Sequence, residues 1–440
     1  MKFFLILSVS IILVSCSFDN KSGIWKNNNQ LSKEKDNLKE FQNLYTQSKS
    51  FNKIIEPKKK LNILLDPIIS TSTWTDIYFN NLNKLDNFKY ENYNQLVYKS
   101  NKITKYETSN RILYENQNII CSDKKGNVIV FSLSEEKQIF KYNFYKKNYK
   151  KIAKNLSLIV ENNIIYVGDN FGYIYALDYV KDKLLWARNF KTPFRSNLKI
   201  QGNNLVIADI NNALYFINKN NGEKFKVLPT EETLIKNEFI NTLISTNKDI
   251  FFLNTYGSLY SVNKNGKINW FTNLNQSSDI NPTNLFNARP ILLHNDKIIV
   301  STDKYLYVLN SNTGSTELKI VISSKIMPLL SGKNLFLVTK DNLLVYIDII
   351  EKKIIYSINL DQKISKYLEI KENEIKNIKS FILANNSIYI FLDNSYYLKL
   401  TPYGTIKKID KLSSQMKSFP IFIKDKVIYL NKKKKLVIIN

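Results

Sequence analysis

The stretch that decides the fold is GDNFGYIYALDYVKDKLLWARNF, at residues 168–190. It contains two short runs rich in aliphatic and aromatic residues, at 173–177 and 184–190, and polar residues separate them. Similar runs at 156–160 and 164–167 precede it. Runs of this length and composition, joined by turns of Asp, Asn and Gly, are typical of antiparallel strands. The stretch therefore predicts one sheet of four short strands.

Comparable units recur along the chain at a nearly constant spacing. The second apolar run of successive units begins at Ile119, Ile164, Leu205, Ile250, Ile298, Leu335, Ile388 and Val427. The steps between these residues range from 37 residues, before Leu335, to 53 residues, before Ile388. A period of about 40 to 50 residues without room for helices indicates a β-propeller with one four-stranded sheet per blade. We therefore expect an all-β fold, an eight-bladed β-propeller of four-stranded antiparallel blades, with seven blades as the alternative because of the uneven 53-residue step.

The last unit, SFPIFIKDKVIYLNKKKKLVIIN at residues 418–440, ends after three predicted strands. A blade without its fourth strand would leave an open sheet edge in the ring. The sequence Leu96-Val97-Tyr98-Lys99 aligns with Leu184-Leu185-Trp186-Ala187 of the opening stretch. We therefore predict that this N-terminal strand completes the last blade and closes the ring.

The N-terminus has the order of features found in an export signal. Lys2 is followed by an apolar run at 3–14, which is shorter than the roughly 20 residues that span a bilayer, and then by Ser15-Cys16. This resembles a bacterial lipobox, which implies cleavage before Cys16 and acylation, including palmitate, of that cysteine. Ser17 in place of aspartate implies a lipid anchor on the periplasmic face of the outer membrane of a Gram-negative bacterium. An ordinary secretory signal with an incidental cysteine is the alternative.

Three regions follow from these patterns. Residues 1–15 are expected to be a lipoprotein signal peptide, and residues 61–440 the propeller. Residues 16–60 are polar and charged, so we expect a lipidated cysteine and a flexible tether, with a marginal helix near 31–48.

Composition excludes several function classes. The two cysteines are Cys16 and Cys121, so lipidation of the first leaves no internal disulfide, and Cys121 lies in a strand run where we expect a small buried hydrophobe. The single histidine, His294, argues against a histidine metal site or a histidine-based triad, and is interpreted as a polar residue at a turn.

The chain carries 64 Lys and Arg against 38 Asp and Glu, a formal net charge of +26. Such a balance suits nucleic acid, an anionic membrane or an acidic partner. The export signal argues against nucleic acid. A general enrichment in Lys, Asn and Ile is an alternative source of the charge, so its role stays open.

The segment GYIYALDYVKDKLLW resembles the repeat G-x-[LIV]-Y-A-L-D-x-x-x-G-K-x-L-W of quinoprotein propellers. The resemblance implies that Trp186 and Trp270 pack between blades and that Ala176 is small where sheets approach. Quinone-dependent dehydrogenases share this repeat, with a calcium ion beside the cofactor and often an adjacent cysteine pair. This sequence has no adjacent cysteines and no calcium-loop spacing. We therefore expect no enzymatic activity, no catalytic residues, no metal site and no cofactor, and keep a quinone-dependent dehydrogenase as the alternative.

A lipobox, a polar tether and eight quinoprotein-like units together resemble the BamB family of propeller lipoproteins in the outer-membrane β-barrel assembly (BAM) complex. The resemblance implies a non-enzymatic scaffold that binds the POTRA domains of BamA and other BAM subunits, with unfolded outer-membrane proteins as further ligands. A periplasmic propeller that binds another partner is a second alternative.

Two loops carry the partner-binding residues that this resemblance implies. TPFRSNL at 192–198 is similar to a family contact loop, which places Phe194 and Arg195 at the interface. IKNEFINTL at 235–243 is similar to an acidic family loop, in which Glu238 matches one aspartate and Ile240 departs from the second. Phe194 as a blade-packing aromatic and Arg195 in a solvated turn are the alternatives.

Overall fold

The computed structural model describes residues 17–18, 25–26, 51–58, 61–145, 149, 151–233, 240–275, 286–369 and 377–440. It divides the chain into two compact units, Met1–Ser50 and Phe51–Asn440. In the first unit it describes β1 (Ser17–Phe18), which pairs antiparallel with β2 (Trp25–Lys26). Cys16, Glu238 and the expected helix near 31–48 lie outside the described residues.

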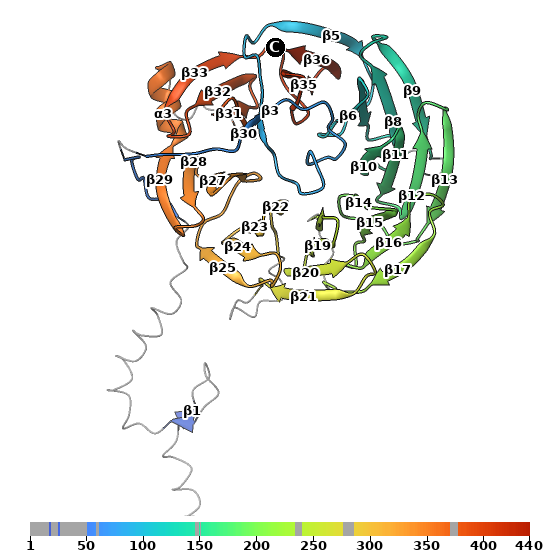
Figure 1. Cartoon of the computed structure of the whole chain (residues 1–440), viewed down its shortest axis with the longest axis horizontal. Coiled ribbons are helices and arrows are strands. Elements are labelled where there is room, and N and C mark those ends of the chain that lie inside the picture. Colours follow the sequence, from blue (N-terminus) through green and yellow to red (C-terminus); the bar gives the residue numbers. More distant parts are fainter. Residues whose placement is uncertain are drawn as a thin grey trace, which may run out of the picture. The chain divides into compact units, whose positions relative to one another are not determined.

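The second unit is a ring of eight blades, each containing a four-stranded antiparallel sheet (Figure 1). Blades 1 to 4 consist of β6 (Leu113–Glu115), β7 (Asn118–Ser122), β8 (Asn127–Ser132) and β9 (Lys137–Asn143); β10 (Leu156–Glu161), β11 (Ile164–Asp169), β12 (Tyr173–Asp178) and β13 (Lys183–Asn189); β14 (Lys199–Gln201), β15 (Asn204–Ala208), β16 (Leu214–Asn218) and β17 (Lys224–Leu228); and β18 (Thr242–Ser245), β19 (Asp249–Leu253), β20 (Ser258–Asn263) and β21 (Ile268–Asn273).

Blades 5 to 8 follow in the same order. They consist of β22 (Leu292–His294), β23 (Lys297–Ser301), β24 (Leu306–Asn310) and β25 (Thr316–Ile320); β26 (Leu329–Ser331), β27 (Asn334–Val338), β28 (Leu343–Asp348) and β29 (Lys353–Asn359); β30 (Ile378–Ala384), β31 (Ser387–Leu392), β32 (Tyr396–Leu400) and β33 (Ile406–Lys411); and β34 (Ile421–Ile423), β35 (Lys426–Leu430), β36 (Lys435–Ile439) and β5 (Leu96–Lys102). Two short parallel strands, β3 (Ile68–Ile69) and β4 (Asn87–Phe88), extend blade 7 at its inner edge.

The predicted ring closure is confirmed. β5 pairs antiparallel with β36, with Tyr98 opposite Ile438 and Lys99 opposite Val437. The N-terminal strand thus serves as the outer strand of blade 8, and the eight-bladed prediction holds over the seven-bladed alternative.

The sequence period is confirmed as well, because all eight residues used to define it lie in the second strand of successive blades. The uneven step before Ile388 has a local cause. The helix α3 (Leu360–Leu368) is inserted between the outer strand of blade 6 and the inner strand of blade 7. The Asn359 side chain caps it by accepting a hydrogen bond from the Gln362 amide, and Leu360 and Ile364 are buried.

The two sides of the ring are distinguished by their connections. An antiparallel four-stranded blade brings the turn between its second and third strands to the same side as the link to the next blade; we call this side the loop face. The other turns lie on the opposite side, which we call the turn face.

Aromatic residues fasten neighbouring blades, as the quinoprotein repeat implied. Trp186 of blade 2 donates from Nε1 to the Lys219 carbonyl in blade 3 (2.9 Å), and Trp270 of blade 4 donates to the Ser311 carbonyl in blade 5 (3.0 Å). Each indole lies against a glycine of the next blade. A Cβ on Gly222 would lie 2.4 Å from Trp186 Cε3, and one on Gly314 would lie 2.4 Å from Trp270 Cε3. Only glycine therefore leaves room for these indoles.

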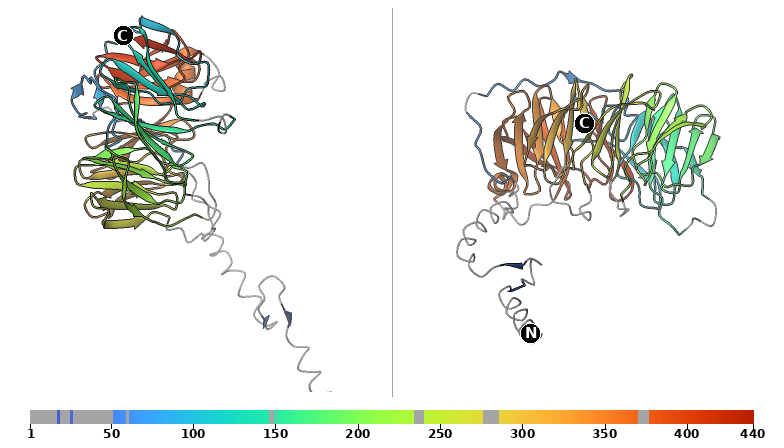
Figure 2. Two further views of the ribbon diagram at one scale, coloured as in Figure 1. Left: turned by 90° about the vertical axis from the view of Figure 1, so that its right-hand side faces the viewer. Right: turned by 90° about the horizontal axis from the view of Figure 1, so that it is seen from below.

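Residues 61–94 form a segment that the sequence did not predict, which we call the strap. It runs along the turn face and crosses the middle of the ring (Figures 1 and 2). It reaches the innermost strand of every blade through contacts with Tyr114, Val160, Lys199, Ser245, Leu293, Ser331, Leu383 and Phe422. Its Trp74, Asn83 and Phe88 are at most 1% exposed, so the strap is part of the core.

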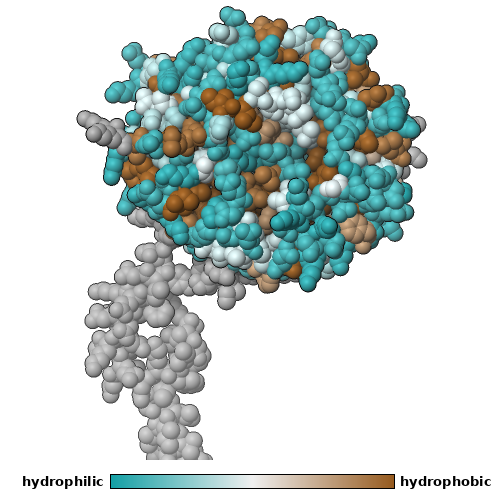
Figure 3. Space-filling model, viewed as in Figure 1, coloured by the Kyte–Doolittle hydropathy of each residue, from teal (hydrophilic) through white to brown (hydrophobic). Residues whose placement is uncertain are grey.

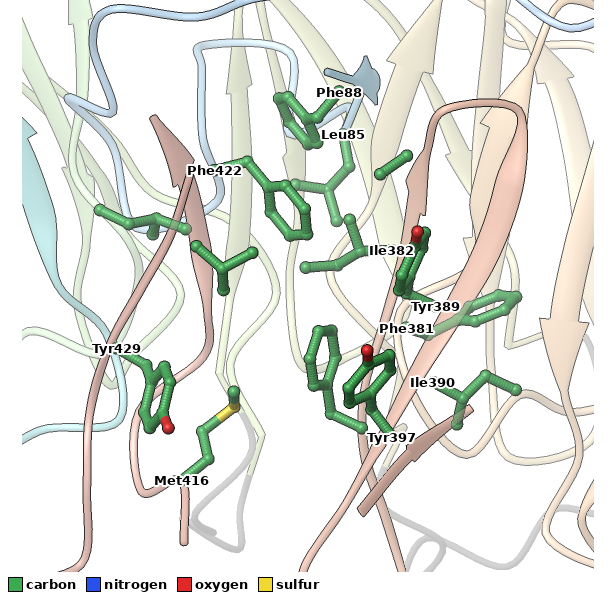
Figure 4. Packing of buried hydrophobic residues seen from close by; sticks show 14 of the residues in the cluster. Leu85, Phe88, Phe381, Ile382, Tyr389, Ile390, Tyr397, Met416, Phe422 and Tyr429 are labelled. Carbon is green, nitrogen blue, oxygen red and sulfur yellow. The ribbon is translucent and has the colours of Figure 1, made fainter. Parts of the chain in front are cut away.

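The strap closes the space between the inner strands of blades 7 and 8. Phe88 stacks on Phe422 with ring centroids 5.5 Å apart, above Ile382 of β30 (Figure 4). Leu85 lies beside them and is 8% exposed. The compact unit starts at Phe51, ten residues before the expected propeller boundary, because Ile55 forms a backbone bridge with Ser357 of β29.

The turn face is hydrophilic over most of its area, with small separate apolar patches (Figure 3). No helix within the described ranges has the length and apolar character needed to cross a lipid bilayer.

Candidate partner-binding site

The loop at 192–198 leaves β13 on the loop face and is held by three blades. The Phe194 amide donates to the Asp169 carbonyl of blade 2 (3.0 Å), and the Arg195 amide donates to the Ala208 carbonyl of blade 3 (2.9 Å). The Asn241 amide, next to blade 4, donates to the Arg195 carbonyl (3.0 Å). The backbone at Arg195 is therefore fixed on both sides before any partner binds.

Phe194 packs inside this junction rather than projecting from it. It is 7% exposed and lies edge-on to Phe190 and Tyr215, with ring centroids 5.7 Å and 5.5 Å away. This is the blade-packing position that was the alternative for Phe194. In this conformation its side chain fixes the loop and presents little surface to a second protein.

Arg195 is half-buried, and its guanidinium points across the gap between blades 3 and 4. One Nη donates to the Thr255 hydroxyl (2.8 Å) and to the Ile210 carbonyl (3.3 Å). Burial lowers the pKa of Arg195, while the negative charge of Asp209 opposes that shift. An arginine keeps its charge under these conditions, because its ordinary pKa is above 12. The Thr255 hydroxyl and the Ile210 carbonyl thus help to orient a cation at this position.

Two exposed apolar residues are the sequence neighbours of residues that contact this arginine, and the sequence did not single them out as contacts. Ile240, next to Asn241, is 56% exposed, and Tyr256, next to Thr255, is 39% exposed. Exposed aromatic and aliphatic side chains around an arginine are the composition of protein-interface hot spots. Their signal in the sequence was weak: Ile240 stood out as the departure from an acidic position, and Tyr256 sits in an ordinary turn.

Of the other residues singled out, Cys121 is fully buried, as expected, and free. Burial raises the pKa of its thiol to about 12, with Asp123 contributing. His294 ends β22, and its Nε2 lies 3.7 Å from Asp66 Oδ2 of the strap. Burial and the neighbouring Lys84 lower the pKa of His294, so it is neutral at pH 7.

Two cavities of the described part of the chain are large enough for a small ligand. One of about 500 Å³ lies between blades 2 and 3, with Arg188, Lys191, Glu223 and Lys224 in its lining. Another of about 480 Å³ lies at blade 1 and has four lysines in its lining. Within the described part of the chain, no group of three or more His, Cys, Asp and Glu side chains is placed to hold a metal ion.

A family model and solved structures both support the fold. A family model described as outer membrane protein assembly factor BamB matches residues 124–357. The crystal structure of BamB from Moraxella catarrhalis is similar over 77% of this chain and 99% of that chain, with a TM-score of 0.59 and 11% identity. A search of curated protein sequences gave no match.

Solved quinone enzymes are also similar in fold. Quinohemoprotein alcohol dehydrogenase from Comamonas testosteroni matches over 84% of this chain and 81% of that chain, with a TM-score of 0.62 and 8% identity. A europium-containing methanol dehydrogenase matches over 83% and 89%, with a TM-score of 0.58 and 10% identity. At these identities the likeness concerns the fold alone. The family match extends over more than half of the chain, and the chain therefore belongs to the PQQ-like β-propeller family whose model is described as outer membrane protein assembly factor BamB.

Proposed function

We propose that the chain is a non-enzymatic scaffold lipoprotein of outer-membrane protein assembly. In this proposal it binds the POTRA domains of BamA through the loop face between blades 3 and 4. Other BAM subunits and unfolded outer-membrane proteins are further proposed ligands. The observation that carries the proposal is that Arg195 contacts Asn241 and Thr255, whose sequence neighbours Ile240 and Tyr256 are exposed.

Arg195 is favoured over the other arginines of the ring as a contact residue because it is held in place before a partner binds. The Arg195 backbone is bonded to blades 3 and 4, and the guanidinium is already oriented by Thr255. A side chain that is ordered before binding loses less conformational entropy on association. Its fork of donors suits a carboxylate or a row of backbone carbonyls on the partner, as at an exposed strand edge. Phe194 contributes by fixing the loop, and Glu238 is proposed as an acidic contact.

A quinone enzyme is the other function found among proteins of this fold, and the chemistry of the cavities argues against it. A quinone cofactor accompanied by calcium needs carboxylate or carbonyl oxygens as metal ligands. The four charged residues in the lining of the blade 1 cavity are all lysines, and Glu223 is the single carboxylate in the lining of the other. These residues do not fit a calcium-dependent quinone. Binding of pyrroloquinoline quinone with calcium, together with oxidation of alcohols or sugars, would contradict the scaffold proposal.

Capture of BamA POTRA domains by the purified full-length chain in mild detergent tests the proposal. The wild-type chain should retain them, and Arg195→Glu should weaken binding by about 2 kcal/mol or more, as for an interface hot spot. Arg188→Glu is the matched control, because Arg188 is an exposed arginine on β13 and the charge change is the same. Equal losses in both variants would mean that net charge, not the Arg195 site, drives capture. If the wild-type chain did not capture POTRA domains, the proposed function itself would be contradicted.

The lipid anchor is a separate part of the proposal. We propose that Cys16 carries the acyl groups and holds the chain on the periplasmic face of the outer membrane. Cys16→Ala should release the chain from the membrane fraction and remove the acyl mass from its N-terminal peptide. A variant that stays in the membrane with an unmodified N-terminus would contradict the anchor.

A further inference from the structure

The cavity at blade 1 has an unusual charge distribution. It lies on the loop face, where the links before and after blade 1 meet the turn between β7 and β8, and its volume is about 480 Å³. Lys105, Lys125, Lys141 and Lys154 contribute to its lining, and no carboxylate does. Pockets of this size suit small molecules or headgroups.

Lys154 is the buried member of this group. It is 3% exposed, and its ammonium donates to the carbonyls of Tyr149 and Ile152, the second at 2.9 Å. The ammonium also lies 5.2 Å from the centre of the Tyr145 ring. These partners are all neutral. Burial lowers the pKa of Lys154, and the positive charge of Lys125 lowers it further.

Two of the other lysines converge on one aromatic wall. The ammonium groups of Lys105 and Lys125 lie 5.3 Å and 6.0 Å from the centre of the Tyr106 ring. Cations gathered on one side of a pocket raise the local concentration of anions. The Tyr106 and Tyr145 rings offer apolar faces against which the body of a ligand can pack.

Two carboxylates near this cavity accept hydrogen bonds from side chains in or beside its lining. Asp123 accepts hydrogen bonds from the Thr104 hydroxyl (2.7 Å) and the Asn127 amide (2.8 Å). Asp169 accepts one from the Tyr145 hydroxyl (2.6 Å). The lining residues Asn127, Asn143 and Tyr145 thus bond to each other or to these acids, and the charged residues of the lining are all lysines.

We propose that this cavity binds a phosphate-bearing ligand, either a free phosphorylated small molecule or a lipid headgroup. A phosphomonoester carries nearly two negative charges and three acceptor oxygens at pH 7, so it suits a lining with several lysines better than a single carboxylate does. The cavity lies at blade 1, whereas the proposed POTRA site lies between blades 3 and 4.

Calorimetry with inorganic pyrophosphate and cosedimentation with vesicles test this site on the full-length chain. The vesicles are phosphatidylcholine alone or phosphatidylcholine with phosphatidic acid, which exposes a phosphomonoester. Saturable binding of pyrophosphate indicates a soluble ligand. Binding to phosphatidic acid vesicles without binding of pyrophosphate indicates a headgroup. Either result supports binding in this cavity only if the measured affinity depends on the lysines of its lining.

That dependence is measured with Lys125→Gln/Lys141→Gln, two exposed lysines whose replacement should preserve folding. The double variant should lose about tenfold in affinity or more, since charge-assisted hydrogen bonds are removed. Lys264→Gln/Lys267→Gln, in an exposed turn of blade 4, removes the same charge elsewhere and should bind as the wild type does. Equal losses in both double variants, or no binding of either probe, would overturn the proposal. POTRA capture should be unchanged in Lys125→Gln/Lys141→Gln, which separates this site from the proposed scaffold function.

Discussion

Lys199 Nζ lies 2.7 Å from Asp76 Oδ2, and both side chains are almost fully buried, at 0% and 2% exposed. The pair joins the strap to the inner strand of blade 3. The same ammonium also donates to the Asn83 side chain (2.6 Å) and the Asn80 carbonyl (3.0 Å). A charge removed from water this completely is tolerated only because all its neighbours are acceptors held by the strap.

Replacing one partner of that pair should be costly. Lys199→Met should lower the free energy of unfolding by about 3 to 5 kcal/mol, because the buried Asp76 carboxylate loses the ammonium that pairs with it. Chemical denaturation of the purified variants measures this. Lys137→Met is the matched control, since its ion pair with Glu135 is 66% and 51% exposed and should contribute less than about 1 kcal/mol. Similar costs for both variants would show that the strap does not depend on the buried pair.

Glycine beside an interblade indole should not tolerate a methyl group. Gly222→Ala places a Cβ 2.4 Å from Trp186 at a backbone φ of +73°, so we expect destabilisation by about 2 to 4 kcal/mol from overpacking and strain together. Gly202→Ala separates the two causes. Gly202 has a φ of +59° and no atom within 4 Å of the added Cβ, so its replacement should cost only about 1 to 2 kcal/mol. Equal melting temperatures for the two variants would rule out a steric role for Trp186.

The loss of folding stability at acid pH should depend in part on Glu231. Burial raises its pKa, but hydrogen bonds from Tyr260 (2.6 Å), Ser258 (2.9 Å) and Asn254 (3.0 Å) outweigh burial and leave the pKa below its usual value. A lowered folded-state pKa means that the unfolded chain binds more protons, so this stabilisation is present above about pH 4.5 and is lost as the pH falls through the folded pKa.

Glu231→Gln should therefore weaken the pH dependence of stability below about pH 4.5, where the unfolded glutamate titrates. Unfolding midpoints measured across that range test this. Glu223→Gln makes the same substitution at an exposed glutamate of blade 3 and is the matched control. An unchanged profile in Glu231→Gln would mean that these hydrogen bonds do not discriminate between the two protonation states.

The thiol of Cys121 should report on unfolding. With a pKa near 12 and no exposed surface, it should resist alkylation at pH 8 in the folded chain and react at the rate of a free thiol in denaturant. Cys16→Ser makes Cys121 the single cysteine, so labelling can be followed by mass. Fast labelling without denaturant would show that blade 1 opens locally.

Strand positions were predictable because each blade repeats the same local pattern. Ile164 and its seven equivalents all occupy second strands, most of whose side chains are buried in every blade. The strap was not predictable in this way, since its 34 residues follow no period and hold the ring largely through single contacts such as Asn83 with the Leu243 and Ile291 carbonyls. Such contacts depend on where eight blades converge, and no local window of sequence contains that information.

The candidate site, like the fold, could be predicted from the sequence only in part. The sequence placed Arg195 in the loop after β13, because loop position follows from the blade period. It left the orientation of Phe194 open, since its burial depends on Tyr215 of the next blade. The exposure of Ile240 and Tyr256 is likewise a property of the assembled ring.

The pairing of β36 with β5 has a consequence for biogenesis. The ribosome synthesises β5 long before β36. Blade 8 can therefore form only after blades 1 to 7 have been synthesised. Until then the growing chain carries an unpaired edge at β5, which is open to wrong pairing or proteolysis. Loss of Lys435–Ile439 would leave the β5 edge unpaired permanently, so a variant without this strand should not close the ring.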